Sequence, residues 1–161
     1  MVSNRIEVKM GEGVVTMAPY VISSLGLGSC VVVALYDTRQ KIGGLAHVML
    51  PSSSHFQVGH KPYQRADKAI ATLLEGLLMR RASRQDIVAK LVGGARMFSY
   101  EDDRSLGIGQ QNVLSIKDIL RREQIPLIGE DVGGHHGRSV EFHLDSGKLI
   151  VRSIGREERI L

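Results

Sequence analysis

The chain of 161 residues contains a single cysteine, Cys30. A lone cysteine excludes an internal disulfide, and no basic-then-apolar segment of the kind that directs secretion opens the chain. A free thiol is typical of a reducing compartment. We therefore expect a cytoplasmic protein.

Long apolar runs and an excess of charge are also missing. The longest apolar run, residues 30–36, is far shorter than the ~20 residues that a membrane helix needs. Lys and Arg number 21 against 17 Asp and Glu, so the net charge of +4 is small, and it is spread along the chain. Repeats, low-complexity tracts and linkers are absent as well. These absences argue against membrane insertion and a nucleic-acid partner, and they favour one domain over residues 1–161.

Short β-type segments dominate what is present. Two segments instead have apolar residues at spacings of three and four, which predicts amphipathic helices over residues 63–81 and 109–124. Some strands are apolar at every position, so both of their faces should be covered. We expect a mixed, mostly antiparallel α/β fold, with sandwich-like β-layers and the two helices outside. The predicted strands are 5–10, 13–17, 20–24, 30–36, 42–50, 86–92, 126–132, 139–144 and 148–154.

The segment LGLGSCVVVALYDTRQKIGGLAHVML, residues 25–50, reads as two apolar strands joined by a polar loop at residues 37–40. If the loop is centred between Thr38 and Arg39, Cys30 lies directly opposite His47. Directly opposed side chains share a face and have Cβ atoms roughly 4.5 to 5.5 Å apart. A loop of three residues would turn His47 to the other face. The sequence therefore predicts a thiol–imidazole pair.

Such a pair could perform acyl transfer. A free thiol has a pKa near ~8.5, and a neighbouring imidazole can take its proton and stabilise the thiolate. Gly26 and Gly28 allow close approach of the backbone, so N–H groups at Gly28 and Ser29 could stabilise an oxyanion. The alternative is that Cys30 is an inert core residue, which is the commoner role of a lone cysteine in an apolar strand.

Other glycines and histidines favour less specific interpretations. Gly26, Leu27 and Gly28 lead into a strand and lack the third glycine of a dinucleotide-binding loop. The histidines of the Gly-rich segment 133–143 have no second ligand cluster, so we expect neither metal nor cofactor. The glycine pairs 93–94 and 133–134 are typical of tight turns, with a surface for substrate approach as the alternative. The segment 51–62 should be a mobile loop.

Several motifs resemble the CheD family of chemoreceptor glutamine deamidases, and the resemblance runs over nearly the whole chain. The motifs are SLGLGSCVVVALYD, KIGGLAHVMLP, KLVGGARMF, GIGQQNV, GEDVGGHHGRSVEF and SGKLIVR. The resemblance implies that Cys30 is a nucleophile and His47 its base. Where the family has a threonine, six residues before the cysteine, this chain has Ser24, which would orient His47; Ser23 is an alternative. The implied fold is similar to that of toxin-type glutamine deamidases, a β-sandwich flanked by helices.

The resemblance also implies a function. It is hydrolysis of selected glutamine side chains to glutamate, with release of ammonia, in the helical cytoplasmic part of methyl-accepting chemotaxis receptors. No cofactor is required, and a CheC-type phosphatase of the response regulator is an implied partner. Two alternatives stay open. One is a regulatory module that binds and stimulates this phosphatase with Cys30 idle, and the other is a thiol esterase acting on receptor methyl-glutamates.

Overall fold

The computed structural model describes residues 4–52, 61–97 and 107–161. The described chain forms strands and two α-helices, α1 (Ala66–Met79) and α2 (Ile108–Arg122), with a 3-10 turn at Arg84–Asp86. The strands are β1 (Arg5–Glu7), β2 (Gly13–Met17), β3 (Val21–Leu27), β4 (Val31–Asp37), β5 (Ile42–Val48), β6 (Ile87–Gly93), β7 (Leu127–Val132), β8 (Arg138–His143), β9 (Lys148–Arg152) and β10 (Arg159–Ile160).

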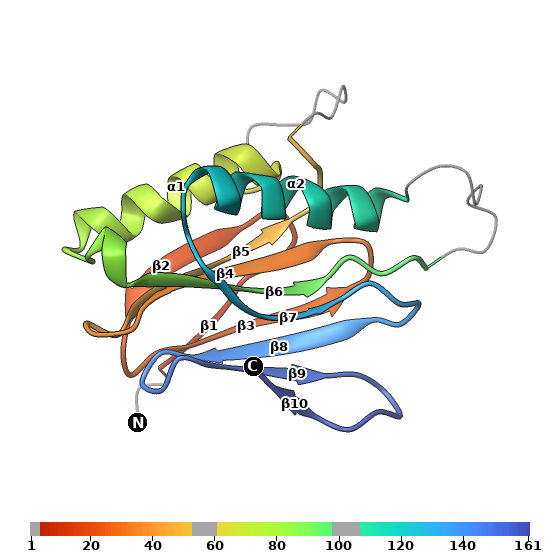
Figure 1. Ribbon diagram of the computed structural model, residues 1–161. Coiled ribbons are helices and arrows are strands. Elements are labelled where there is room, and N and C mark those ends of the chain that lie inside the picture. Colours follow the sequence, from red (N-terminus) through yellow and green to blue (C-terminus); the bar gives the residue numbers. More distant parts are fainter. Residues whose placement is uncertain (1–3, 53–60, 98–106) are drawn as a thin grey trace.

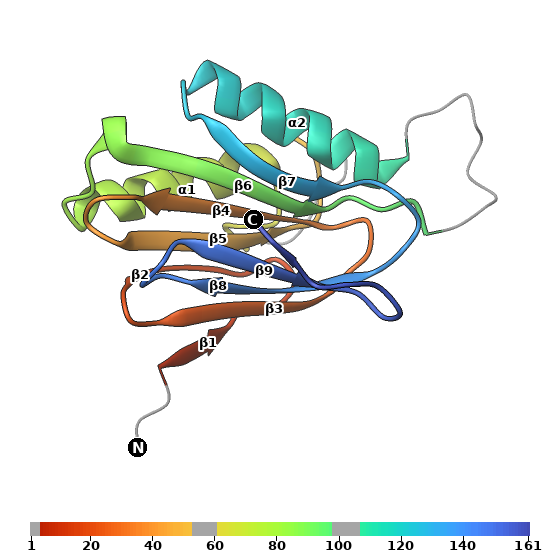
Figure 2. The same ribbon diagram turned by 60° about the horizontal axis from the view of Figure 1, so that its bottom comes forward.

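The strands form two sheets of five, in the orders β1-β3-β8-β9-β10 and β2-β5-β4-β6-β7. Pairing is parallel between β1 and β3 and between β6 and β7, and it is antiparallel in every other pair of these sheets. Figure 1 shows α1 and α2 side by side over the second sheet, with the first sheet beneath it. Figure 2 brings the first sheet forward. The predicted mixed, mostly antiparallel α/β fold with layered sheets and two helices is confirmed.

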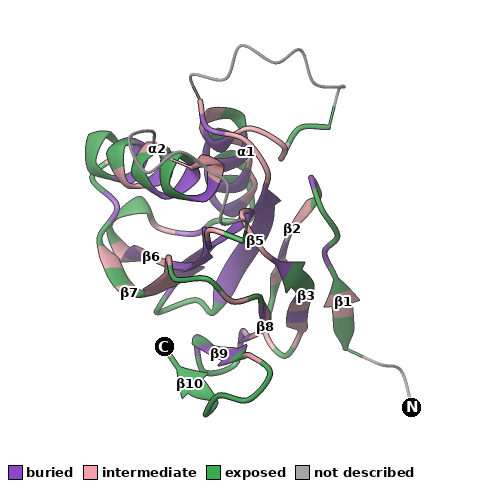
Figure 3. Cartoon of the chain, turned by 90° about the vertical axis from the view of Figure 1, so that its right-hand side faces the viewer, coloured by how far each residue is buried: buried purple, intermediate pink, exposed green. Residues whose placement is uncertain are grey.

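The central strand β4 is buried at every position. Val31, Val33 and Leu35 pack in the core beneath the helices. The alternating residues Val32, Ala34 and Tyr36 pack in a second core between the sheets. Side chains alternate along a strand, so a strand with a core on each side must be apolar throughout. The buried strands at the centre of the layers and the buried faces of the helices are visible in Figure 3.

The two helices bury one stripe each. In α1 the buried residues keep the spacing of three and four that predicted the helix: Ala66, Ala69, Ile70, Leu73, Leu74 and Leu77. In α2 the buried set includes Val113, Ile116 and Leu120. That helix ends before Gln124, which has a positive φ, and Pro126 follows. Both helices are confirmed, and the predicted strands 139–144 and 148–154 are present as the antiparallel pair β8 and β9.

The predicted register of the β4–β5 hairpin is wrong. Val32, and not Cys30, pairs with His47, because Asp37 is still in β4 and pairs with Ile42. The carboxylate of Asp37 accepts backbone N–H groups inside the turn. The centre of the loop is therefore one residue later than predicted, and the residue opposite His47 is two positions later, Val32 in place of Cys30. A shift of two preserves the face. Cys30 and His47 therefore share a face, as expected, but they are diagonal neighbours.

Within the described residues, neither helix has the length and apolar character needed to cross a bilayer. The predicted loop over residues 51–62 falls for its larger part, residues 53–60, outside the described residues.

Candidate active site

A hydrogen bond across the two sheets joins Ser24 on β3 to His47 on β5. Ser24 Oγ lies 2.9 Å from His47 Nδ1, and both residues are buried. Alternation along β3 turns Ser24 toward the facing sheet and its neighbour Ser23 away from it. Of the two serines considered, Ser24 is therefore the one that contacts the imidazole.

The second contact of Ser24 determines which tautomer of His47 fits the site. Ser24 Oγ is 2.6 Å from the carbonyl oxygen of Val8. A carbonyl only accepts and a hydroxyl has one proton, so the hydroxyl donates to Val8. Ser24 Oγ must then accept its other hydrogen bond from Nδ1–H of His47. This arrangement puts the imidazole proton on Nδ1 and leaves a lone pair on Nε2.

The Nε2 atom of His47 is buried and, among the described residues, has no hydrogen-bond partner. Cys30 precedes β4 by one residue and packs in the core between the sheets, which is also the side that His47 faces. Cys30 as a whole residue retains 8% exposure. Diagonal neighbours on one face of a sheet lie roughly 7 to 8 Å apart at Cα. The thiol and the imidazole are thus neighbours without a direct hydrogen bond in this structure.

Burial dominates the electrostatics of the pair. Desolvation raises the pKa of the Cys30 thiol and lowers the pKa of the His47 imidazole. Both shifts favour the neutral forms, because each charged form loses water contacts. The thiolate expected from the sequence is therefore not the favoured resting state. A neutral thiol beside a neutral imidazole suits proton transfer during attack on a substrate.

The backbone around Cys30 is held by the turn at Gly93 and Gly94. The N–H of Gly94 donates to the carbonyl of Cys30, and the N–H of Ala95 donates to that of Gly28, both at 2.9 Å. Gly93 and Gly94 have positive φ values of 116° and 69°, which favour glycine. A Cβ on Gly93 would lie 2.3 Å from the Cys30 oxygen. The glycine pair is a tight turn, and this turn supports the cysteine segment.

One polar residue of this region was missed from the sequence. Asn112, on α2, is fully buried and donates from Nδ2 to the carbonyls of Ser29 and Met49, each at 3.1 Å. Met49 follows β5, so this side chain links the cysteine segment to the histidine strand. The available signals were its place in the motif GIGQQNV and a polar residue on the apolar face of a helix, a pattern that also occurs without function.

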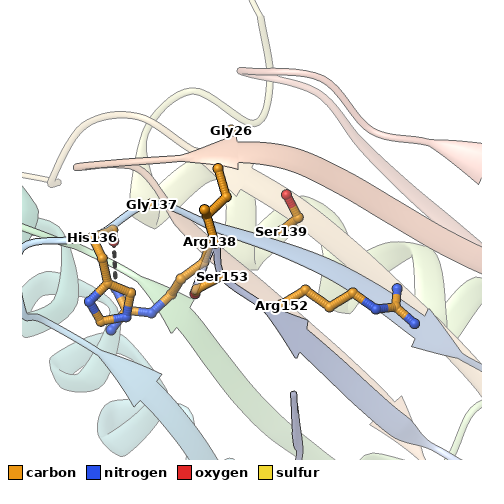
Figure 4. Close-up of a pocket in the computed structure, with 8 residues that line it drawn as sticks. Gly26, His136, Gly137, Arg138, Ser139, Arg152 and Ser153 are labelled. Atoms are coloured by element: carbon orange, nitrogen blue, oxygen red, sulfur yellow. Dashed lines mark hydrogen bonds between the residues drawn. The ribbon is translucent and has the colours of Figure 1, made fainter. Parts of the chain in front are cut away.

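Two surface pockets are lined by segments that adjoin the site in sequence. One pocket of about 470 Å³, shown in Figure 4, is lined by Gly26, His136, Gly137, Arg138, Ser139, Arg152, Ser153 and Ile154. Its two arginines already have carboxylate partners: Asp131 for Arg138, and Glu141 and Glu158 for Arg152. Another pocket, of about 380 Å³, includes Gly94 and Ala95 in its lining. Neither lining includes Ser24, Cys30 or His47.

Two of the three histidines of segment 133–143, His135 and His143, have other partners. His135 Nδ1 lies 3.0 Å from the carbonyl oxygen of Arg96, and His143 Nε2 lies 3.2 Å from Glu141. Over residues 4–52, 61–97 and 107–161, no three His, Cys, Asp or Glu side chains gather in a way that could hold a metal ion.

Comparison with known proteins shows the family to which the chain belongs. The family model described as CheD chemotactic sensory transduction matches residues 49–153. A protein of Moorella thermoacetica named "Probable chemoreceptor glutamine deamidase CheD" is 45% identical over 96% of this chain and 95% of its own length. The chain belongs to the CheD family. CheD proteins with the same name from Methanosarcina barkeri (41% identical, 94% of this chain and 100% of its own) and Caldanaerobacter subterraneus (38%, 96% of each) are also similar.

The fold is also similar to that of a solved structure that is not named as a CheD protein. The crystal structure of the hypothetical protein YfiH of Bacillus licheniformis superposes with a TM-score of 0.51. The match covers 80% of this chain and 63% of that protein, at 18% sequence identity. At this identity the likeness concerns the fold alone.

Proposed function

We propose that this CheD protein is a thiol-dependent amidohydrolase that converts selected glutamine side chains of chemotaxis receptors to glutamate. The observation that carries the proposal is the imidazole of His47, with Nδ1–H bound to Ser24 and an unpartnered Nε2 on the face it shares with Cys30. The names of the CheD relatives, which describe chemoreceptor glutamine deamidases, support the substrate class.

In the first half of the reaction, Cys30 Sγ attacks the carbonyl carbon of the glutamine amide, and His47 Nε2 accepts the thiol proton. The resulting tetrahedral intermediate carries the negative charge on oxygen. His47 then returns the proton to the departing nitrogen, the C–N bond breaks, and ammonia leaves. The product of this half is a thioester between Cys30 and the substrate side chain.

In the second half, water attacks the thioester. His47 Nε2 accepts a proton from the water, and the collapse of the second intermediate breaks the C–S bond. The proton returns to sulfur, so glutamate is released and the thiol is restored. Ser24 keeps the Nδ1–H of His47 bound throughout, so Nε2 is the nitrogen that gains and loses the proton, and no cofactor takes part.

Backbone N–H groups of Ser29 and Cys30 are the candidates for oxyanion stabilisation. Among the described residues, neither donates to a main-chain acceptor. The segment lies next to the thiol, and the oxyanion would form on the oxygen of the carbonyl that the thiol attacks. Gly28, proposed from the sequence as a further contributor, allows close approach because it has no side chain; a Cβ at this position would lie 3.3 Å from Met97 Cγ.

The proposed reaction is tested by the product it releases. A receptor cytoplasmic fragment carrying both glutamine and methyl-glutamate is incubated with the protein, and ammonia and methanol are measured together with glutamate formed. The proposal expects ammonia in proportion to glutamate. Methanol without ammonia would favour the esterase, and neither product, from folded protein with a cognate receptor, would favour the regulatory binding module.

A further inference from the structure

Three successive carbonyls around the thiol are each bound by a different donor. Gly28 O accepts from Ala95 N, Ser29 O from Asn112 Nδ2, and Cys30 O from Gly94 N. These donors belong to the glycine turn after β6 and to α2. The orientation of the peptide planes at residues 28–30 is therefore imposed from outside the segment.

The orientation of Asn112 is itself well determined. Its amide faces two carbonyl oxygens, those of Ser29 and Met49, so only the NH₂ end can point toward them. The opposite atom, Oδ1, is buried and has no partner among the described residues. A buried acceptor without a partner is unfavourable, so the side chain is placed for its donors. Leucine at this position would leave the carbonyls of Ser29 and Met49 without this donor.

Binding a carbonyl also orients the N–H of the same peptide unit. In a trans peptide the C=O and N–H point in opposite directions. The cis bond that the structure contains lies elsewhere, at Ala18-Pro19. With Ser29 O drawn to Asn112, the N–H of Cys30 points away from α2. That N–H is one of the two beside the thiol that donate to no main-chain acceptor within the described part of the chain.

The first turn of the helix that carries Asn112 packs closely against the glycine turn. A Cβ on Gly109, in the first turn of α2, would lie 2.5 Å from Ala95 O and 2.7 Å from Gly94 O. The start of α2 is therefore in direct contact with the turn that binds the neighbouring carbonyls. The helix and the turn together hold Gly28, Ser29 and Cys30 in one orientation.

We infer that Asn112 is a positioning residue, which aims the Cys30 N–H at the oxyanion of the acyl-transfer intermediate and ties this segment to the strand that carries His47. The inference rests on the proposed function, because an oxyanion forms only if Cys30 performs acyl transfer. It adds to that function a residue outside the Cys30, His47 and Ser24 set.

The test compares two reactions of the same thiol. Acylation by p-nitrophenyl acetate passes through an oxyanion, whereas alkylation by iodoacetamide does not. Both rates are measured for wild type, Asn112→Leu and Asn112→Asp, with the Cys30→Ala rate subtracted as background. Ser115→Ala is the matched control, since it removes a polar contact of α2 with Ser52, away from the thiol.

Loss of Asn112 is expected to slow acylation about 10- to 100-fold and to leave alkylation within about threefold of wild type. The control should change neither rate. An equal fall in both rates, or no fall in acylation, would overturn the inference. If Asn112→Leu does not fold, the isosteric Asn112→Asp decides. The comparison needs no receptor, so a wild-type protein that fails to convert receptor glutamine refutes the proposed function separately.

Discussion

The hydroxyl of Ser24 lies between the carbonyl of Val8 and the imidazole of His47, at 2.6 Å and 2.9 Å. It therefore accepts from Nδ1–H and directs the basic nitrogen, Nε2, to the side of Cys30. Ser24→Ala should lower kcat on a receptor fragment about 10- to 100-fold, because the tautomer is no longer selected. It should also lower the free energy of unfolding by about 1–3 kcal/mol, since two buried polar groups lose their partner.

Two variants serve as controls for Ser24. Ser24→Thr restores the residue found in the family pattern and should retain most of the activity, because the hydroxyl is kept. Ser23→Ala changes a hydroxyl on the other face of β3 and should leave kcat within about twofold of wild type. A fall in activity for Ser23→Ala equal to that for Ser24→Ala would contradict the assignment.

The acid limb of the pH–rate profile should report His47. Burial lowers the pKa of this imidazole, so the neutral base persists to a pH below the ordinary value of about 6.5. The rate constant kcat/KM should therefore hold as pH falls toward about 6.5 and decrease only at lower pH. Steady-state kinetics between pH 5 and 8 measures this limb. An inflection above about pH 7 would mean a stabilised imidazolium and would contradict the neutral resting pair.

The alkylation rate of Cys30 should show the opposite shift. Burial raises the pKa of the thiol, so iodoacetamide should react more slowly than with a free cysteine at neutral pH, and the rate should climb above about pH 8.5. Mass spectrometry of the labelled protein against time gives the rate. Fast labelling at pH 7 that His47→Ala abolishes would instead indicate a preformed thiolate–imidazolium pair.

The hairpin that sets the register of Cys30 against His47 should depend on Asp37. Its carboxylate accepts N–H groups from Arg39, Gln40 and Ser83, and these bonds outweigh burial and lower its pKa. Asp37→Ala should reduce the free energy of unfolding by about 2–3 kcal/mol in urea denaturation. Thr38→Ala, at an exposed position of the same loop, should change it by less than about 0.5 kcal/mol. Equal losses of unfolding free energy in the two variants would contradict a stabilising role of the Asp37 carboxylate.

The layers of the fold could be predicted because alternation and helical spacing are local signals. The apolar strand β4 and the stripe of α1 need no knowledge of their partners. The hairpin register could not be predicted fully, because the position of the loop depends on how the Asp37 side chain binds the turn. The short strand β10 was missed, since Arg159–Ile160 is too brief to have a pattern.

In the candidate site, too, some residues could be predicted from local sequence and others could not. Cys30 and His47 were found from their shared hairpin, which is a local relationship. The choice between Ser23 and Ser24 required the packing of β3 on the opposite sheet, and Asn112 required the docking of α2. Such contacts join segments far apart in the chain, and no spacing rule predicts them. The implied CheC-type partner and the cytoplasmic location stay predictions.

The most direct test of the account is mass spectrometry of a cognate receptor cytoplasmic fragment after incubation with wild type, Cys30→Ala, His47→Ala and Ser23→Ala. Wild type and Ser23→Ala are predicted to convert glutamine to glutamate at specific positions. Cys30→Ala and His47→Ala are predicted to be slower by about 10³-fold or more. Conversion that survives Cys30→Ala at the wild-type rate would contradict the thiol mechanism.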